Sequence, residues 1–338
     1  MTATTDFAGP QGMVGNNRVM PTAPASSVRN TSDVQSTLAR VLLTREVGQR
    51  IPTVQYLQQT VRAGTGTVMK ALRALEANGA ISLSSHGHQG TMLVSRDAGK
   101  LWNEAHLGNF ALLMPPPGPV EQQGILDTVQ SSLASQGVPV VVSALAGARR
   151  RLEEVYFERT DAVVVSAAAF ARHQEDFPGL AAVVLGDSTF YSAGSLVVVE
   201  RHGGHSAGRL RVGIDRASHD HQLLTETEFA DLDVEFVDAR FVTGPAAVLR
   251  GRVDAAIWHS MPTVISPQLA GLRVRSVSDA TLDATRDVSR AVLVTRSLDA
   301  GASALIRDVT PASIAKAQSR LLRLAVDNEE DDASSRLS

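Results

Sequence analysis

Apolar residues recur at helical spacing three times between residues 34 and 80, which predicts three consecutive helices. The first ends near Arg45, and Thr53 is placed to cap the second. A break at residues 63–66 precedes the third helix, which Thr65 or Thr67 is expected to cap. The buried stripe of the third helix is predicted at Val68, Ala71, Leu72 and Leu75, with a left-handed stop at Gly79.

Two short apolar runs follow the third helix. They cover residues 80–83 and 91–94, and a segment with two glycines joins them, which predicts a β-hairpin. Three helices followed by a two-stranded wing make a winged helix-turn-helix, in which the third helix enters a major groove of DNA. The order of these elements therefore predicts a DNA-binding module.

Short apolar runs alternate with helical stretches from residue 110 onward, a pattern typical of parallel βαβ units. The first series has strands expected at 110–114, 138–142, 162–165, 181–185 and 195–200. After a glycine-rich break at 203–208, the second has them at 210–214, 234–237, 255–258 and 272–274. Two such halves predict a two-lobed α/β domain with a cleft between the lobes. A strand at 291–295 is expected to return to the first lobe, and an amphipathic helix starts after Thr310-Pro311.

The two ends of the chain have no sustained apolar period, so we expect them to be disordered. This pattern predicts five segments. They are a disordered arm (1–33), a winged helix-turn-helix domain (34–96), a linker (97–108), a two-lobed effector-binding domain (109–326) and a disordered acidic tail (327–338).

The 338 residues include no cysteine, which excludes disulfides, thiolate zinc sites, iron–sulfur clusters and a cysteine nucleophile. No stretch approaches the roughly 18 apolar residues of a membrane span, and the first 30 residues lack the pattern of a secretory signal. We therefore expect a cytoplasmic protein without a membrane partner.

Charge is unevenly divided along the chain. Residues 34–100 carry eight basic and three acidic side chains, a surplus of five, whereas residues 1–33 balance. Since the whole chain has a net charge of −3, the remainder carries −8. A small basic module joined to a larger acidic domain indicates that only the module meets a polyanion, although a chance fluctuation of surface charge is an alternative.

Several residues of the basic module have the chemistry to bind duplex DNA, because basic side chains release counterions condensed on the phosphates. Arg73 is the best candidate base reader, since arginine pairs bidentately with guanine. Threonines at a helix start suit a phosphate, and plain helix capping is their alternative role. A solvated hairpin tip is the alternative for the wing. The candidate residues are Arg50, Thr53, Arg62, Thr65, Gly66, Thr67, Lys70, Arg73, His88 and Gln89.

Ligands of open α/β lobes bind beyond the carboxyl ends of strands, against helix N-termini. Asp215 follows one such strand, and Ser218 is a candidate cap for the next helix, although a capping box of Thr225 with Glu228 is a competing start. His259 is expected to reach the cleft. The loop 114–118 is expected to face it from the other lobe. The candidate ligand-binding residues are Asp215, Ser218, Asp220, Asp254 and Trp258, with a core position as the alternative for Trp258.

Enzyme interpretations have weaker support in the sequence. His219 with His221, and His202 with His205, have no established zinc spacing, and solvated histidines are the alternative. The pattern Gly204-x-Ser206-x-Gly208 formally matches a nucleophile elbow but leads into a strand rather than a helix. We therefore expect no catalytic residue, no metal and no cofactor.

The motifs resemble a known family of regulators. Gly48-Gln-Arg-Ile-Pro-Thr, the third helix from Thr67 and the wing from His86 resemble GntR-type winged-helix regulators. Together with Val212-Gly-Ile-Asp and Gly251-Arg-Val-Asp-Ala-Ala-Ile-Trp, the chain looks like the YhfZ branch of that group over residues 34–325. Two arginines that many GntR-type regulators carry are absent near Thr53 and Thr65.

The resemblance implies an effector domain similar to type 2 periplasmic solute-binding proteins behind the DNA-binding module. The expected protein is thus a homodimeric transcriptional regulator, because one winged helix reads only a short half-site. A small polar metabolite bound between the lobes is expected to modulate operator binding. The alternatives are a regulator without a ligand response and an enzyme fused to a DNA-binding domain.

Overall fold

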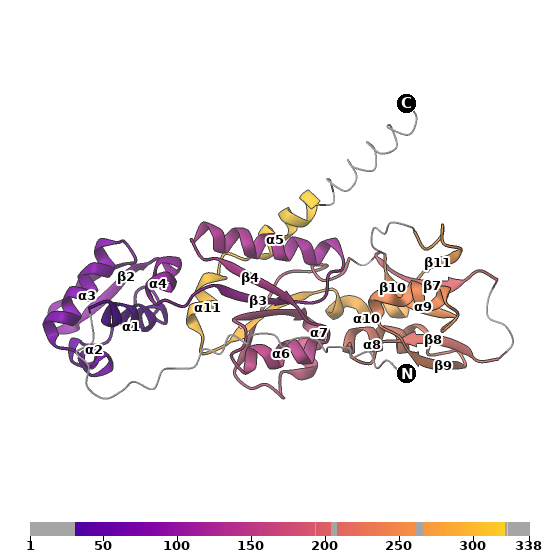
Figure 1. The fold of residues 1–338 in the computed structure, drawn as a ribbon, viewed down its shortest axis with the longest axis horizontal. Coiled ribbons are helices and arrows are strands. Elements are labelled where there is room, and N and C mark those ends of the chain that lie inside the picture. The colour runs from indigo at the N-terminus through magenta and orange to yellow at the C-terminus, as the bar shows by residue number, and fades with distance from the viewer. Residues whose placement is uncertain (1–30, 193, 204–207, 261–265, 322, 324–338) are drawn as a thin grey trace, which may run out of the picture.

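The chain folds into three bodies in a row, as the computed structural model shows (Figure 1). The structure describes residues 31–192, 194–203, 208–260, 266–321 and 323. The predicted arm and acidic tail lie almost wholly outside the described residues. In the described part of the chain, no helix is both long and apolar enough to cross a membrane.

The front module, residues 31–96, is a winged helix-turn-helix, as predicted. Its helices are α1 (Thr31–Leu43), α2 (Val54–Val61) and α3 (Thr65–Ala77), and its antiparallel wing is β1 (Ile81–Ser85) and β2 (Thr91–Arg96). The four stripe residues predicted on α3 are the four that are buried. The turn before α2 joins the wing, because Ile51 N–H donates to Thr91 O at 2.9 Å.

The predicted linker contains a short helix, α4 (Ala98–Glu104). Asp97 caps this helix by accepting a hydrogen bond from Lys100 N–H at 2.9 Å. Leu101 and Trp102 are buried in an apolar cluster that runs without interruption from the front module into the next body. The 97–108 segment therefore packs between the two bodies.

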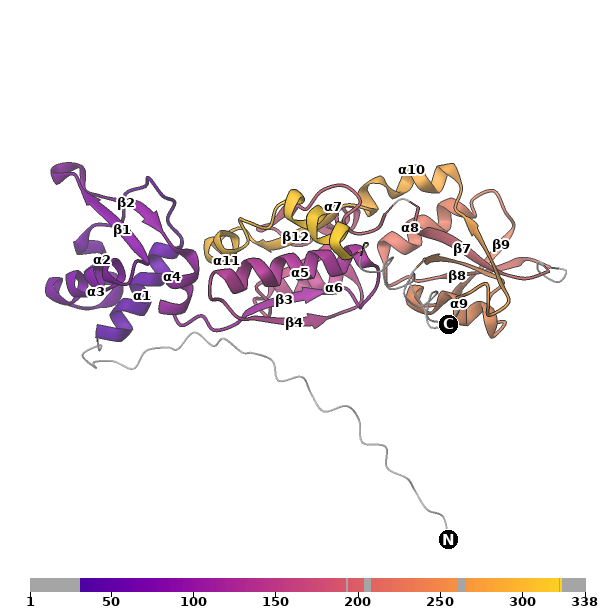
Figure 2. The ribbon, with the colours of Figure 1, turned by 90° about the horizontal axis from the view of Figure 1, so that it is seen from above.

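The second body, lobe 1, is built on a sheet of strand order β4-β3-β5-β12-β6, in which β12 is antiparallel to both of its neighbours. Helices α6 and α7 cover one face, and α5, α11 and the helix after Thr310 cover the other (Figure 2). The elements are β3 (Phe110–Met114), α5 (Val120–Ser135), β4 (Val140–Ala144), α6 (Ala148–Tyr156), β5 (Ala162–Ser166), α7 (Ala167–His173), β6 (Leu180–Val184), β12 (Ala291–Arg296) and α11 (Ala300–Leu305).

The third body, lobe 2, has a sheet of order β9-β8-β10-β7-β11, in which β7 is the antiparallel strand. Helices α8 and α10 cover one face and α9 covers the other. The elements are β7 (Leu196–Arg201), β8 (Leu210–Ile214), α8 (His219–Glu228), β9 (Val234–Asp238), η2 (Phe241–Thr243), α9 (Gly244–Leu249), β10 (Ala255–His259), β11 (Leu272–Ser276) and α10 (Asp279–Val288).

The two sheets have matching strand orders, and each receives its antiparallel strand from chain that has just crossed from the other lobe. The return of β12 to lobe 1 confirms the expectation for residues 291–295. The expected crossing at 203–208 is wrong, because β7 already pairs with β10 and β11 of lobe 2. The chain crosses between β6 and β7, and the described residues of this crossing segment are 185–192, 194 and 195. The two-lobed α/β fold itself is confirmed.

Candidate functional site

The end of the molecule farthest from lobe 2 is formed by the front module (Figure 2). Helix α2 begins at the predicted cap, since the Thr53 hydroxyl accepts a hydrogen bond from Tyr56 N–H at 3.3 Å. It ends at Arg62, whose φ of 51° lies in the left-handed region, so the backbone turns sharply into α3. This turn leaves the arginine side chain exposed.

Arg50, Lys70 and Arg73 are also exposed, and none of these four basic residues forms an ion pair with another described residue. Acidic side chains of the front module are used elsewhere. Glu76 accepts a hydrogen bond from Leu83 N–H at 3.1 Å and so fastens α3 to the wing. The exposed face of α3 therefore carries two positive charges, Lys70 and Arg73, without an ion-pair partner among the described residues.

The start of α3 differs from the expected threonine cap. The N-cap is Gly64, which offers no side-chain hydrogen bond, so neither Thr65 nor Thr67 caps the helix. Because glycine leaves the first amides of α3 without a side-chain acceptor, the exposed hydroxyl of Thr65 and these amides remain available to an anion. Gly66 is exposed beside them, and a Cβ there meets nothing within 4 Å.

His88 and Gln89 lie at the wing tip, in the short 3-10 helix η1 (Gly87–Gln89). Both are exposed. Gly87 and Gly90 flank the tip with φ of 55° and 88°, conformations that glycine adopts without strain. The structure therefore presents the tip residues to solvent on the same module as α3.

A second group of predicted residues meets at the boundary between the lobes. Ser218 caps α8 by accepting a hydrogen bond from His221 N–H, so the competing start at Thr225 is wrong; Thr225 is buried inside the helix. Asp215 accepts from Ala217 N–H and Phe241 N–H, both at 3.1 Å. Its carboxylate therefore holds two loops of lobe 2 in place.

Asp220, in the first turn of α8, forms a hydrogen bond to lobe 1. Ser166, at the end of β5, donates a hydrogen bond from its hydroxyl to Asp220 Oδ1 at 2.8 Å. Burial raises the pKa of Asp220, against the opposing effect of this hydrogen bond. Burial lowers the pKa of the nearby Arg151 to about 10, although the charge of Asp220 opposes that shift.

His221 is buried behind Asp220 and is a neutral structural group. Asp215 N–H donates to its Nδ1 at 3.0 Å, and its Nε2 lies 3.2 Å from Ile257 O. Since Nδ1 accepts this hydrogen bond from Asp215, it carries no proton, and the ring proton of neutral His221 is on Nε2. Burial lowers the pKa of His221, which favours this neutral form.

Two predicted ligand residues are not brought to this boundary. Asp254 precedes β10 and lies at the opposite edge of the sheet, where Arg211 donates to both carboxylate oxygens at 3.1 and 2.7 Å. These hydrogen bonds lower the pKa of Asp254. Trp258 is buried in the apolar cluster against α9 with Val199 and Val248, which matches its core alternative.

A further group lies where the chain first crosses between the lobes, and of its residues the sequence had indicated only His259. Glu121, near the start of α5, accepts hydrogen bonds from Ser192 through its main-chain N–H and its hydroxyl. His259, at the carboxyl end of β10, has its Nε2 2.7 Å from Ser195 Oγ. We call Glu121, Ser192, Ser195 and His259 the crossover group. The loop 114–118 was a usable signal for Glu121, because it leads directly into α5.

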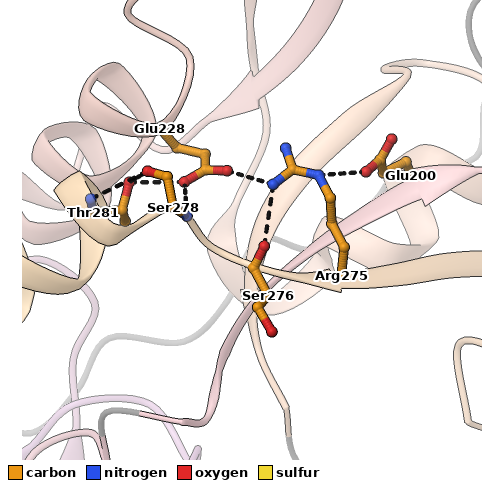
Figure 3. Close-up of polar contacts among 6 residues, drawn as sticks. All are labelled: Glu200, Glu228, Arg275, Ser276, Ser278 and Thr281. Carbon is orange, nitrogen blue, oxygen red and sulfur yellow. Dashed lines mark hydrogen bonds and ion pairs between the residues drawn. The ribbon is translucent and has the colours of Figure 1, made fainter.

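A polar cluster at the far end of α8 has a structural role (Figure 3). Arg275 donates to Glu200 at 2.6 Å and to Glu228 at 2.5 Å. Burial alone raises the pKa of Glu228, but hydrogen bonds from Ser278, Arg275 and Thr281 outweigh it and leave the pKa below its usual value. Because Ser278 caps α10, this cluster anchors the helix that leads back to lobe 1.

The enzyme alternatives find little support in the described residues. Residues 204–207, which include His205 and most of the elbow pattern, lie outside the described residues. His221 is committed to Asp215 and Ile257, while the His219 ring lies 6.4 Å from that of His173. Among the described side chains, no three histidine, aspartate or glutamate residues converge as metal ligands.

Two family models match the chain. A YhfZ C-terminal domain matches residues 97–329, and a helix-turn-helix domain matches residues 46–93. An uncharacterized YhfZ protein of Escherichia coli is 30% identical over 232 residues, which are 69% of this chain and 75% of that protein. The crystal structure of YhfZ from Shigella flexneri is 26% identical with a TM-score of 0.52, covering 67% of this chain and 95% of the other.

Proposed function

Because the chain belongs to the YhfZ family, we propose that it is a cytoplasmic, GntR-like transcriptional regulator that binds a DNA operator as a homodimer. Its front module recognises sequence, and a small polar metabolite between the lobes changes operator affinity. The observation that carries the DNA-binding part is the exposed face of α3, where Lys70 and Arg73 form no ion pair with a described residue.

The candidate residues divide into two roles in this proposal. Arg50, Arg62 and Lys70 contact phosphates, as do Thr53, Thr65, Gly66 and Thr67 at the helix starts. Arg73 reads a guanine from α3, and His88 and Gln89 of the wing contact the adjacent groove or backbone. The phosphate contacts set affinity and its dependence on salt, whereas Arg73 sets sequence preference.

In the effector part of the proposal, the metabolite binds beside Asp215, Ser218 and Asp220. Asp220 carries this part, since it is the predicted residue whose hydrogen bond to Ser166 spans the two lobes. A metabolite shifts DNA binding only by its different affinity for DNA-competent and DNA-incompetent arrangements of the dimer. Asp254 and Trp258 are left out of this site because they lie elsewhere in lobe 2.

No catalytic role is proposed. The Ser195–His259 distance of 2.7 Å is that of a nucleophile and its base, but the Ser195 hydroxyl also lies 2.6 Å from Ser192 O, an acceptor. The hydroxyl proton is thus directed away from the imidazole. Such an arrangement favours a structural or binding role for the pair.

The DNA-binding proposal is tested by selecting an operator from random duplexes and measuring its affinity across a salt series. The Lys70→Ala/Arg73→Ala variant is expected to bind more weakly, with a logarithmic salt slope shallower by roughly 1 for each phosphate that is no longer neutralised. Arg73→Ala alone is expected to bind the operator about 5- to 150-fold more weakly and to relax preference at one position. Unchanged binding by the double variant contradicts the assignment of α3.

The matched control is Arg240→Ala/Lys316→Ala, which removes the same two charges from exposed positions outside the front module. We expect it to retain operator affinity and salt slope.

A parallel thermal-shift screen of metabolites tests the effector part, since a ligand at about 100 times its Kd adds roughly 2.7 kcal/mol of stability. A stabiliser that leaves operator affinity unchanged contradicts that part.

A further inference from the structure

We infer that the crossover group binds the protonated amine of a ligand, held by Glu121 of lobe 1 and His259 of lobe 2. This inference rests on the proposed function, because it names the chemical class of the effector that the lobes enclose. The observation behind it is that each of these buried side chains has one polar atom without a hydrogen-bond partner among the described residues. These atoms are Glu121 Oε2 and His259 Nδ1.

The proton on His259 is placed by its neighbours. Ser195 Oγ lies 2.6 Å from Ser192 O, and a carbonyl oxygen only accepts, so the serine donates its single proton there. Ser195 Oγ must then accept from His259 Nε2, 2.7 Å away. Burial lowers the pKa of His259 and keeps the ring neutral, although Glu121 and the Ser260 backbone oppose this shift. Nδ1 of His259 therefore carries no proton and can only accept a hydrogen bond.

Glu121 presents a second bare acceptor. Its Oε1 receives the main-chain N–H of Ser192 at 3.0 Å and the Ser192 hydroxyl, while Oε2 receives no hydrogen bond from the described part of the chain. The side chain is 5% exposed and His259 is 2% exposed, so water does not solvate either atom. An unpaired buried polar atom is costly, and an unpaired buried charge is more so.

The ligand group that satisfies both atoms must donate hydrogen bonds and carry positive charge. A primary ammonium has three donors and no acceptor, whereas a carboxylate or phosphate offers only acceptors and would repel Glu121. Aromatic rings complete the environment. Tyr191 lies 5.1 Å from the His259 ring and 6.3 Å from the Phe241 ring, and aromatic faces attract ammonium groups.

The placement of the two acceptors links ligand binding to lobe closure. Glu121 is carried by α5 of lobe 1 and His259 by β10 of lobe 2, and Ser192 and Ser195 of the crossing segment lie between them. An amine that bonds to both side chains is held only while the lobes are together. Such a ligand therefore has the different affinity for two arrangements that a regulator requires.

The experiment measures binding of matched compounds to the full-length chain by thermal shift and calorimetry. The pairs are putrescine with 1,4-butanediol, glucosamine with glucose, and alanine with lactate, which differ by a hydroxyl in place of the amine. We expect at least one amine to bind, with its partner at least tenfold weaker. Equal binding of both members of every binding pair, or no binding by any amine, overturns the inference.

Two near-isosteric variants locate the site. Glu121→Gln keeps Oε1 as an acceptor for Ser192, and His259→Gln keeps a donor toward Ser195, so each removes chiefly the bare acceptor. We expect each to weaken the amine at least tenfold, while Glu235→Gln, which removes an exposed carboxylate on β9, changes nothing. Unchanged amine affinity in both variants overturns the inference. If a variant does not fold, the wild-type comparison of matched pairs still decides.

Failure of this inference is distinct from failure of the proposed function. A stabiliser without an amine that alters operator affinity, and that binds Glu121→Gln as it binds wild type, overturns the amine assignment and leaves the regulator intact. Absence of duplex binding by the wild-type chain even at low salt, or unchanged binding by the Lys70→Ala/Arg73→Ala variant, contradicts the DNA-binding proposal, whatever the amines do.

Discussion

The two junctions of this chain differ in chemistry. The front module meets lobe 1 through an apolar cluster that includes Leu43, Trp102 and Leu305 without a break. Lobe 1 meets lobe 2 through polar contacts such as Ser166 with Asp220 and through smaller apolar contacts, in which Ala168 of α7 packs against the apolar cluster of lobe 2 and Tyr191 packs against clusters of both lobes. A continuous packed core resists sliding more strongly than a junction made of a few hydrogen bonds and small apolar contacts.

Close backbone approaches reinforce the first junction. Gly99 of α4 lies so near the end of α5 that an added Cβ would be 2.0 Å from Gln136 O. Arg40 of α1 donates to Ala105 O at 3.0 Å, and Arg307 of lobe 1 donates to Glu46 of the front module at 3.2 Å. We therefore expect the front module and lobe 1 to move as one unit, and lobe 2 to move against them.

The largest effect is expected from Leu101→Ala, at the centre of the first junction, where Leu101 is fully buried. The weaker packing and the cavity should lower the free energy of unfolding by about 2–5 kcal/mol. The chain has two tryptophans, so a Trp258→Phe background lets Trp102 fluorescence report on this junction during denaturant unfolding. The control is Leu249→Ala, because Leu249 is a half-exposed leucine of lobe 2. A loss of unfolding free energy below about 1 kcal/mol for Leu101→Ala contradicts a packed junction.

Glu228→Gln tests lobe 2 alone, because the Glu228 side chain is 2% exposed and holds Arg275 and the start of α10. We expect a loss of about 1.5–3 kcal/mol, typical of hydrogen bonds to a buried charge. Since the pKa of Glu228 is lowered, wild type holds this advantage above the unfolded pKa and loses it as pH falls through the folded pKa. Trp258 fluorescence in a Trp102→Phe background measures the free energy of unfolding of both proteins. A stability difference between wild type and Glu228→Gln that does not change with pH contradicts a charged, hydrogen-bonded Glu228.

Gly99→Ala sharpens the comparison by inserting one methyl group into the first junction. The clash with Gln136 O involves backbone atoms, so we expect a loss of about 1–3 kcal/mol. Gly66→Ala is the matched control, because its Cβ meets nothing within 4 Å, and it should gain about 0.4–1 kcal/mol. Equal effects of the two substitutions on unfolding would show that the junction is loosely packed.

The smallest effect is expected from Asp220→Asn at the second junction. Since the pKa of Asp220 is raised, the folded chain binds more protons than the unfolded chain, and stability falls as pH rises through that window. Asparagine keeps an oxygen for Ser166 and removes the titration, so the variant should show a flatter Tm profile above about pH 4, the ordinary pKa of an aspartate. An unchanged slope contradicts burial of a titrating Asp220.

The front module was predictable from sequence because its information is local. The stripe of α3 and the cap at Thr53 follow from helical spacing and from one hydroxyl at a helix start. Neighbouring threonines misled the prediction of the next cap, since capping depends on where the backbone enters the helix, and Gly64 takes that place. The apolar side chains at 101–102 were present in the predicted linker, but their spacing did not reveal what they pack against.

The rear domain was less predictable because its information is non-local. The run at 196–201 has the apolar pattern of a strand, but the pattern does not show which strands it pairs with. Because it pairs with β10 and β11 of lobe 2, the chain crosses between the lobes before this strand and not after it. Asp254 and Asp215 flank similar strands, yet one precedes its strand and the other follows, so they lie at opposite sheet edges. Glu121 and His259 are brought together by both lobes at once, which a pattern along the chain does not show.

The contrast between the junctions is tested most directly by distance measurements between spin labels, for which a chain without cysteine is well suited. Labels at Gln89→Cys and Gln130→Cys span the front module and lobe 1, and labels at Gln130→Cys and Glu235→Cys span the two lobes. We predict one narrow distance distribution for the first pair and a broad or two-peaked distribution for the second. A first distribution as broad as the second would contradict the account.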